Sequence, residues 1–276
     1  MQDDLDNLAA VASIAGTASV IDLAAYENDA EGQPASVAVL TAEADVALAH
    51  QDLLDERDEA IGELLATVGR RIRRVVADQE NEVLDLIRRN RKAKTAEQIL
   101  PSLAEQHETY RSAVGTDLAA VIAAGVEFAQ VGWHNAAPSA KRLDASLDAV
   151  LDRVDTALIE PLIAKLSRVI ANTDDTSLDR IELVDAVRRG YREFKGDRLG
   201  EVAGDLVTFA YSSGVLAAAK PGQSTCWIVD HSGRPCPDGE DNSLAGPVVV
   251  GEEFPTGDVC PPVHSGCRCL LVPADR

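Results

Sequence analysis

Cysteine is absent from the first 225 residues, and aromatic residues make up only 4% of the chain. The first absence confines any thiol chemistry to residues 226–269, which hold all five cysteines. The second disfavours a β-sandwich, whereas abundant alanine and leucine suit helix-on-helix packing. We therefore expect an α+β protein with a mostly α-helical body and a small, irregular, β-rich C-terminal module.

Positive charge is almost missing from residues 1–60, where Arg57 is the single basic residue among fourteen acids. The net charge of −20 argues against a general nucleic-acid coat, because such a surface repels phosphates. The leader MQDDLDN is acidic where a secretory signal is basic, and the apolar stretch 8–25 contains Asp22, so we expect no membrane span. A protein made in the reducing cytosol favours thiolates or metal ligands over disulfides.

Recognisable enzyme motifs are also missing. The chain has no H-E-x-x-H of a metallopeptidase, no G-x-S-x-G elbow and no H-x-E of a zinc deaminase. It has no glycine loop for nucleotide phosphates either. Four histidines have no acid or base partner at a telling spacing: His50, His107, His134 and His231. We expect no catalytic activity.

Composition divides the chain into three parts. Residues 1–40 are an acidic arm that we expect to be weakly ordered, residues 41–220 a helical body, and residues 221–276 a Cys/His-containing module. In the body, an apolar stripe from Leu54 to Ile87 predicts one long helix or a closely broken pair. Further helices are expected near 103–129, 139–172, 181–194 and 197–219, with Pro161 kinking or dividing the second of these. The module has short β-type runs at 226–229, 247–250 and 270–272.

Nine of the 26 basic residues fall within positions 70–94. They form either a solvated helix face that neutralises nearby acids or a local contact for DNA or an acidic partner, and composition leaves both open. The candidate nucleic-acid contacts are Arg70, Arg71, Arg73, Arg74, Arg88, Arg89, Arg91 and Lys92.

The cysteines and one histidine of the C-terminal module are candidate ligands for a soft divalent metal. Zinc takes four nitrogen or sulfur ligands at tetrahedral corners, usually from two short chain segments. The alternative is that the cysteines are buried as small hydrophobic side chains or are paired in an oxidising environment, and that the histidine only hydrogen-bonds a turn carbonyl. The candidate set is Cys236, His264, Cys267 and Cys269, with Cys226 and Cys260 as alternates.

The C-terminal residues also resemble a known module. The series is Trp227, CPDG at 236–239, GP at 246–247, FPTG at 254–257 and PPVHSGCRC at 261–269. It resembles the C-terminal module of phage Mu F-like minor head proteins, the head-morphogenesis proteins of tailed bacteriophages. The run AGDLVTFAYSSGVLAAA at 203–219 is similar to the helix before that module, so the resemblance covers about residues 180–273.

Three departures separate the chain from the family pattern. Gly239 stands where the second cysteine of C-P-x-C is usual, Ser265 stands for a proline, and residues 204–206 replace R-T-E. The first departure removes one thiolate from the pattern. The third removes an arginine and a glutamate of the pattern, and so argues against any function that depends on either of them.

The resemblance implies a structural, non-catalytic minor capsid protein of the virion. Family members associate with the portal vertex inside the head and assist head assembly, DNA packaging or DNA delivery. For this chain it implies portal and capsid proteins as partners, a location inside the capsid after assembly in the host cytoplasm, and packaged DNA near the basic stretch. Two alternatives stay open: an ADP-ribosyltransferase-like enzyme, and a zinc-stabilised adaptor that binds a host protein.

Overall fold

The computed structural model describes residues 35–90, 92–174 and 180–276, so most of the expected acidic arm lies outside the described residues. It confirms the α+β class, because the described part of the chain is mostly helical, with a small three-stranded antiparallel sheet near the C-terminus. In chain order the elements are α2 (Ala35–Arg89), α3 (Ala96–Ile99), α4 (Leu103–Trp133), α5 (Ala140–Val154), the π-helical turn η2 (Asp155–Ile159), α6 (Glu160–Asp174), α7 (Arg180–Asp197), α8 (Leu199–Ala218), β1 (Ser224–Ile228), α9 (Pro237–Leu244), β2 (Val248–Val249) and β3 (Leu270–Pro273).

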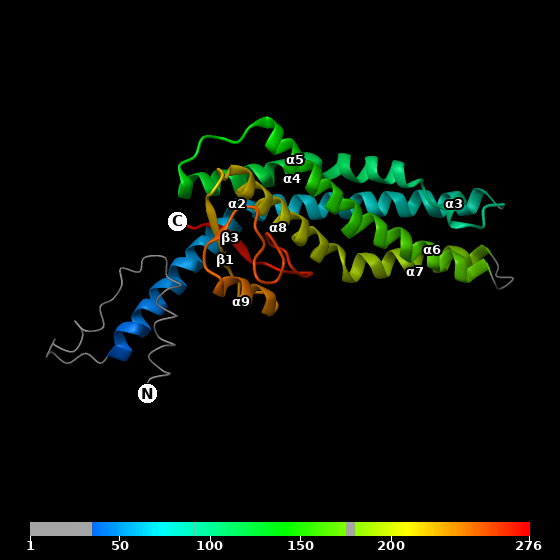
Figure 1. Ribbon diagram of the computed structural model, residues 1–276. Coiled ribbons are helices and arrows are strands. Elements are labelled where there is room, and N and C mark those ends of the chain that lie inside the picture. The colour runs from blue at the N-terminus through cyan, green and yellow to red at the C-terminus, as the bar shows by residue number, and fades with distance from the viewer. Residues whose placement is uncertain (1–34, 91, 175–179) are drawn as a thin grey trace.

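The longest element is α2, a helix of 55 residues that crosses most of the molecule (Figure 1). It begins at Ala35, six residues before the expected start of the body, and its N-terminal part projects beyond the bundle (Figure 1). The buried stripe from Leu54 to Ile87 is present as predicted. Leu86, which the pattern also placed in the stripe, is 37% exposed, and Leu84 is buried instead. Two further expected members, Leu65 and Val75, are partly buried.

The centre of the bundle is the contact between α4 and α8. A β-carbon added at Gly125 would lie 2.1 Å from the carbonyl oxygen of Tyr211, and one added at Gly214 would lie 2.1 Å from that of Ile122. The two helices therefore meet backbone to backbone, which requires glycine on both sides. By length and composition α4 could cross a membrane, but it packs against α2, α5 and α8, which accounts for its apolar character.

A buried polar network also joins α2 to α4. The amide of Gln79 donates to Gln106 over 2.7 Å and accepts the hydroxyl of Tyr110 over 2.8 Å. Gln106 in turn donates to the carbonyl oxygen of Pro101. Because each amide has a partner, the network fixes the two helices in one register without leaving a buried polar group unpaired.

The expected helix 139–172 is divided close to Pro161. The π-helical turn η2 stands directly before α6, in which Pro161 is the second residue. Proline has no N–H to donate four residues back and its ring crowds that carbonyl, so a widened turn fits here. The carboxylate of Asp155, the first residue of this turn, is buried and pairs with Arg111 and His107 of α4.

The C-terminal module packs on the bundle through β3, which contacts α8 and α4. Its sheet has the strand order β2-β1-β3, with both pairings antiparallel. In the register of β1 and β3, Cys226 lies opposite Val272 and Ile228 opposite Leu270. The expected β-type runs therefore form strands, although each is short.

An ion-pair bridge attaches the module to α2. Arg57 and Arg268 each bind the buried carboxylate of Asp230 at 2.9 Å, and Arg268 also reaches Asp58 at 2.6 Å. Arg57 additionally donates to the main-chain oxygen of Arg268 and is only 3% exposed. Burial of Asp230 opposes its ionisation, but hydrogen bonds from Ser232 and from the two arginines outweigh it and lower its pKa to about 2. The bridge therefore holds a charged carboxylate at neutral pH.

Candidate metal centre

Three of the expected ligands meet inside the module. The Sγ atoms of Cys236, Cys267 and Cys269 all lie within 4.8 Å of one another, and all three side chains are buried. Two of these atoms, in Cys236 and Cys269, are 3.7 Å apart. A tetrahedron with metal–sulfur bonds of about 2.3 Å has an edge of about 3.8 Å, so the spacing fits a thiolate metal site. Across residues 35–90, 92–174 and 180–276, no second group of potential ligand atoms is this close together.

Local geometry places each sulfur. Cys236 is the N-cap of α9, with Pro237 in the first helical turn, and its sulfur accepts a hydrogen bond of 3.3 Å from the N–H of Gly239. Cys267 and Cys269 are two residues apart in the segment that leads into β3, a spacing that places side chains on the same side of an extended chain. The guanidinium of the intervening Arg268 turns to Asp230 instead.

The three thiols differ in acidity. The pKa of Cys267 is lowered, chiefly by a hydrogen bond from Cys269, and burial opposes this shift without cancelling it. That hydrogen bond, together with burial, raises the pKa of Cys269. Burial and the charge of Cys267 raise the pKa of Cys236. Deprotonation of all three, which thiolate coordination requires, therefore depends on the positive charge of the ion.

Two more residues cover the sulfurs. Gly239 approaches so closely that a β-carbon there would lie 2.7 Å from the sulfur of Cys236 and 2.8 Å from that of Cys269. The indole of Trp227 on β1 has a buried Nε1 with no oxygen or nitrogen acceptor, and it favours the thiolate form of Cys269. The ring of Phe254 packs edge-on against this indole, with centroids 5.1 Å apart. The sulfur cluster is thus enclosed by an aromatic pair and by main chain.

The remaining candidate ligands lie outside the group of three. Cys226 is half-buried in β1, and Cys260 is buried elsewhere in the module, where burial raises the pKa of its thiol to about 12. His264 is in the turn before Cys267, and neither ring nitrogen belongs to the cluster. Its Nδ1 lies 3.0 Å from the carbonyl oxygen of Ser265, while its Nε2 is buried without a partner.

The basic residues at 70–90 lie on exposed faces of α2, and the basic stretch continues into the segment after it. Several are engaged with acids, which is what a solvated face predicts. The ion pairs are Arg71 with Asp117, Arg74 with Asp78, and Arg88 and Arg89 with Asp85, while Arg70 donates to Thr67. Arg91 lies outside the described residues, and contact with DNA stays a prediction.

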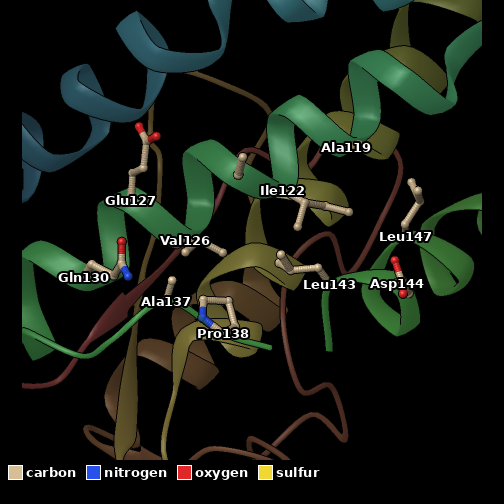
Figure 2. A pocket seen from close by; sticks show the side chains of 11 residues that line it. Ala119, Ile122, Val126, Glu127, Gln130, Ala137, Pro138, Leu143, Asp144 and Leu147 are labelled. Atoms are coloured by element: carbon tan, nitrogen blue, oxygen red, sulfur yellow. The ribbon is translucent and has the colours of Figure 1, made fainter. Parts of the chain in front are cut away.

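A cleft of about 360 Å³ lies between α4, α5 and the segment that joins them (Figure 2). Aliphatic side chains from the two helices converge on it, and its lining is apolar apart from Glu127, Gln130 and Asp144. Neither a cysteine nor a histidine lines it, so the candidate metal ligands of the C-terminal module lie elsewhere.

Sequence reasoning missed the ion-pair bridge and the close approach of Gly239. The sequence did hold a signal for the bridge. Arg57 is the single basic residue among the fourteen acids of residues 1–60, which marks it as a candidate for an ion pair. For Gly239 the signal was its position in the C-P-x-C pattern.

Comparisons of the chain with protein-family models, with curated proteins and with solved structures each find no match.

Proposed function

We propose that the protein is a structural component of a tailed-bacteriophage head, in which a zinc ion clasps the C-terminal module. The group formed by Cys236, Cys267 and Cys269 supports this proposal best. Zinc is the first choice because it accepts thiolate ligands in tetrahedral sites that hold small modules together. An ion held here would cross-link the start of α9 to the approach to β3, two segments that are far apart in the sequence.

The enclosure of the sulfurs supports a structural role over a catalytic one. A catalytic zinc keeps an open position for water or substrate, whereas these side chains are buried and covered by Trp227 and Gly239. The three strands of the module have only five, two and four residues. Such a small sheet has little core of its own, and a bound ion can offset that deficit.

The assignment to a phage head comes from the sequence resemblance at Trp227 and at 236–269, and the helical body is consistent with it. Long helices such as α2 offer extended surfaces to other proteins, as a docking component needs. We propose the portal and other capsid proteins as partners, a site of action inside the capsid, and assembly in the host cytoplasm. Packaged DNA would contact the basic residues of α2.

Metal content tests the clasp directly. Zinc measured by mass spectrometry on untagged full-length protein should be close to one per chain, and should drop sharply in Cys236→Ser. Serine is itself a good N-cap, so this change removes the ligand while keeping the start of α9. Cys226→Ser is the matched control and should keep its zinc, because Cys226 lies outside the cluster. Equal zinc in the two variants, or none in the wild type, would contradict the clasp.

Two assays test the phage role. The full chain should copurify with portal rings, and loss of that association at physiological salt would argue against a portal-bound component. In filter binding, affinity for DNA should fall as salt rises, and the slope should shrink when Arg70, Arg73 and Arg74 are replaced by alanine. Absence of salt-dependent affinity would remove DNA from the list of partners.

A further inference from the structure

Three thiolates leave one corner of a zinc tetrahedron to fill, and the fold limits the source of the fourth ligand. Position 239 cannot supply it in the observed arrangement, since any β-carbon there would lie within 3 Å of two sulfurs. Cys226 and Cys260 are both outside the cluster. Of the candidate ligands named from the sequence, this leaves His264, three residues before Cys267.

His264 has the local arrangement of a metal ligand. Nδ1 lies 3.0 Å from the carbonyl oxygen of Ser265. In the neutral tautomer with the proton on Nδ1, this contact is a hydrogen bond and Nε2 carries the lone pair. That Nε2 atom is buried and has no hydrogen-bond partner in the protein. Histidines that bind metals usually donate their second ring N–H to a carbonyl or carboxylate in this way. The imidazole is also near enough to Cys267 to affect its charge.

Two carboxylates of α8 hold the turn that carries this histidine. Asp205 accepts the main-chain N–H of Gly266 at 2.8 Å, and Glu201 accepts the hydroxyl of Ser265 at 3.1 Å. Each acid therefore has an oxygen engaged with the turn, and the two hydrogen bonds attach the turn to α8.

We propose that His264 completes the site through Nε2, so that this chain binds zinc with three cysteines and one histidine. The inference rests on the proposed zinc clasp and adds its ligand set. The imidazole takes the place of the thiolate that Gly239 cannot provide. Because neither ring nitrogen lies in the sulfur cluster, the proposal requires the His264 side chain to move toward the three sulfurs when the ion binds. Three thiolates and a neutral imidazole suit a tetrahedral divalent ion.

Zinc-edge X-ray absorption on the full-length protein, loaded with one equivalent of zinc, tests the ligand set. The wild type should show three sulfur neighbours and one nitrogen, with the outer-shell scattering of an imidazole. His264→Ala should lose the imidazole signal, and its zinc affinity, measured by competition with a chromophoric chelator, should fall by about tenfold or more. His231→Ala is the control, because His231 belongs to the same module but is exposed and lies near Glu240. It should leave both readouts unchanged.

The outcomes separate the ligand assignment from the clasp. If the wild type binds zinc but lacks imidazole scattering, or if His264→Ala keeps the wild-type spectrum and affinity, the assignment to His264 is wrong and the clasp stands. If the wild type binds no zinc, the clasp itself fails. Far-UV circular dichroism of each variant verifies that the helical body is folded before the metal is added.

Discussion

In the helical body, Ser102 is the N-cap of α4, and its hydroxyl accepts the N–H of Glu105; in the C-terminal module, Cys236 is the N-cap of α9, and its sulfur accepts the N–H of Gly239. Both atoms satisfy a free N–H at the start of a helix. The hydroxyl also donates to the Glu105 carboxylate and so acts within its own helix, whereas the sulfur is also a ligand for a soft metal. The module thus uses one side chain for local structure and for a long-range cross-link.

The two regions also differ in what holds them together. The body buries continuous apolar stripes on long helices, such as the stripe of α2 from Leu54 to Ile87. The module has short strands, an enclosed sulfur cluster and an ion-pair bridge to α2. In the body, apolar burial spreads the free energy of folding over many residues. In the module, a metal site and an ion-pair bridge concentrate it in a few. The two regions should therefore fail separately, and in response to different changes.

Chelation should have the largest effect, and only on the module. Structural zinc contributes on the order of 10 kcal/mol of binding free energy in small zinc modules, which is lost when the ion is removed. In a Trp133→Phe background Trp227 is the single tryptophan, so its fluorescence should shift to the red as water reaches the indole. The far-UV circular dichroism of the helices should change little. If the far-UV circular dichroism were lost together with the change in Trp227 fluorescence, the two regions would not unfold separately.

Gly125→Ala should give the next largest loss, this time in the body. The added methyl would overlap the carbonyl oxygen of Tyr211, a main-chain atom that cannot rotate away, so we expect destabilisation of about 3 kcal/mol, the upper end of the usual range for overpacking. Chemical denaturation followed by circular dichroism measures it. Gly62→Ala on α2 is the matched control, because nothing lies near its added methyl, and it should stabilise by about 0.5–1 kcal/mol. Similar values for the two would refute the backbone contact.

Arg57→Met should weaken the attachment between the two regions. The change leaves Asp230 with Arg268 as its remaining arginine and removes a donor from the main chain of Arg268, which should cost about 2–3 kcal/mol. Limited proteolysis of the module and denaturation of the whole chain report the loss. Arg74→Met removes an exposed pair with Asp78 and should change stability by less than about 0.5 kcal/mol. A loss as large as that of Arg57→Met would contradict the bridge.

Ser102→Ala should have the smallest effect, about 1 kcal/mol, by removing the cap of α4. The cap also predicts a pH dependence, since hydrogen bonds from Ser102 lower the pKa of Glu105 below its unfolded value of 4.5. Its contribution is therefore complete above pH 4.5 and is lost as the pH falls through the lowered pKa. Glu105→Gln should lack this part of the acid dependence when denaturation is compared at several pH values. An unchanged acid profile would mean that the cap does not involve the carboxylate.

Local features of the sequence were enough to predict the class and much of the body. Helical periodicity depends on residues three or four apart, so the stripe of α2 and the break near Pro161 could be inferred directly. The contact of Gly125 with Tyr211 could not, because nothing in the local sequence distinguishes it from the other glycines of the chain. Its role depends on which helix lies across it.

Three members of the candidate site could be named from the sequence. The C-x-C spacing of Cys267 and Cys269 indicates two sulfurs on one side of the chain, and Cys236 was the first choice for a third, ahead of Cys226 and Cys260. The structure brings Cys236 to the pair and leaves both ring nitrogens of His264 outside the cluster. Which side chains meet depends on how distant segments of the module fold together, and spacing along the chain does not determine that.

Because α2 is one uninterrupted helix, it fixes the distance between the elements that it contacts. Arg57 meets the C-terminal module and Gln79 meets α4, and the helix between them sets a separation of about 33 Å at a rise of about 1.5 Å per residue. One residue inserted between these positions would rotate one contact by about 100° relative to the other. The count of residues in this stretch is therefore as constrained as their identity, even where the side chains face solvent.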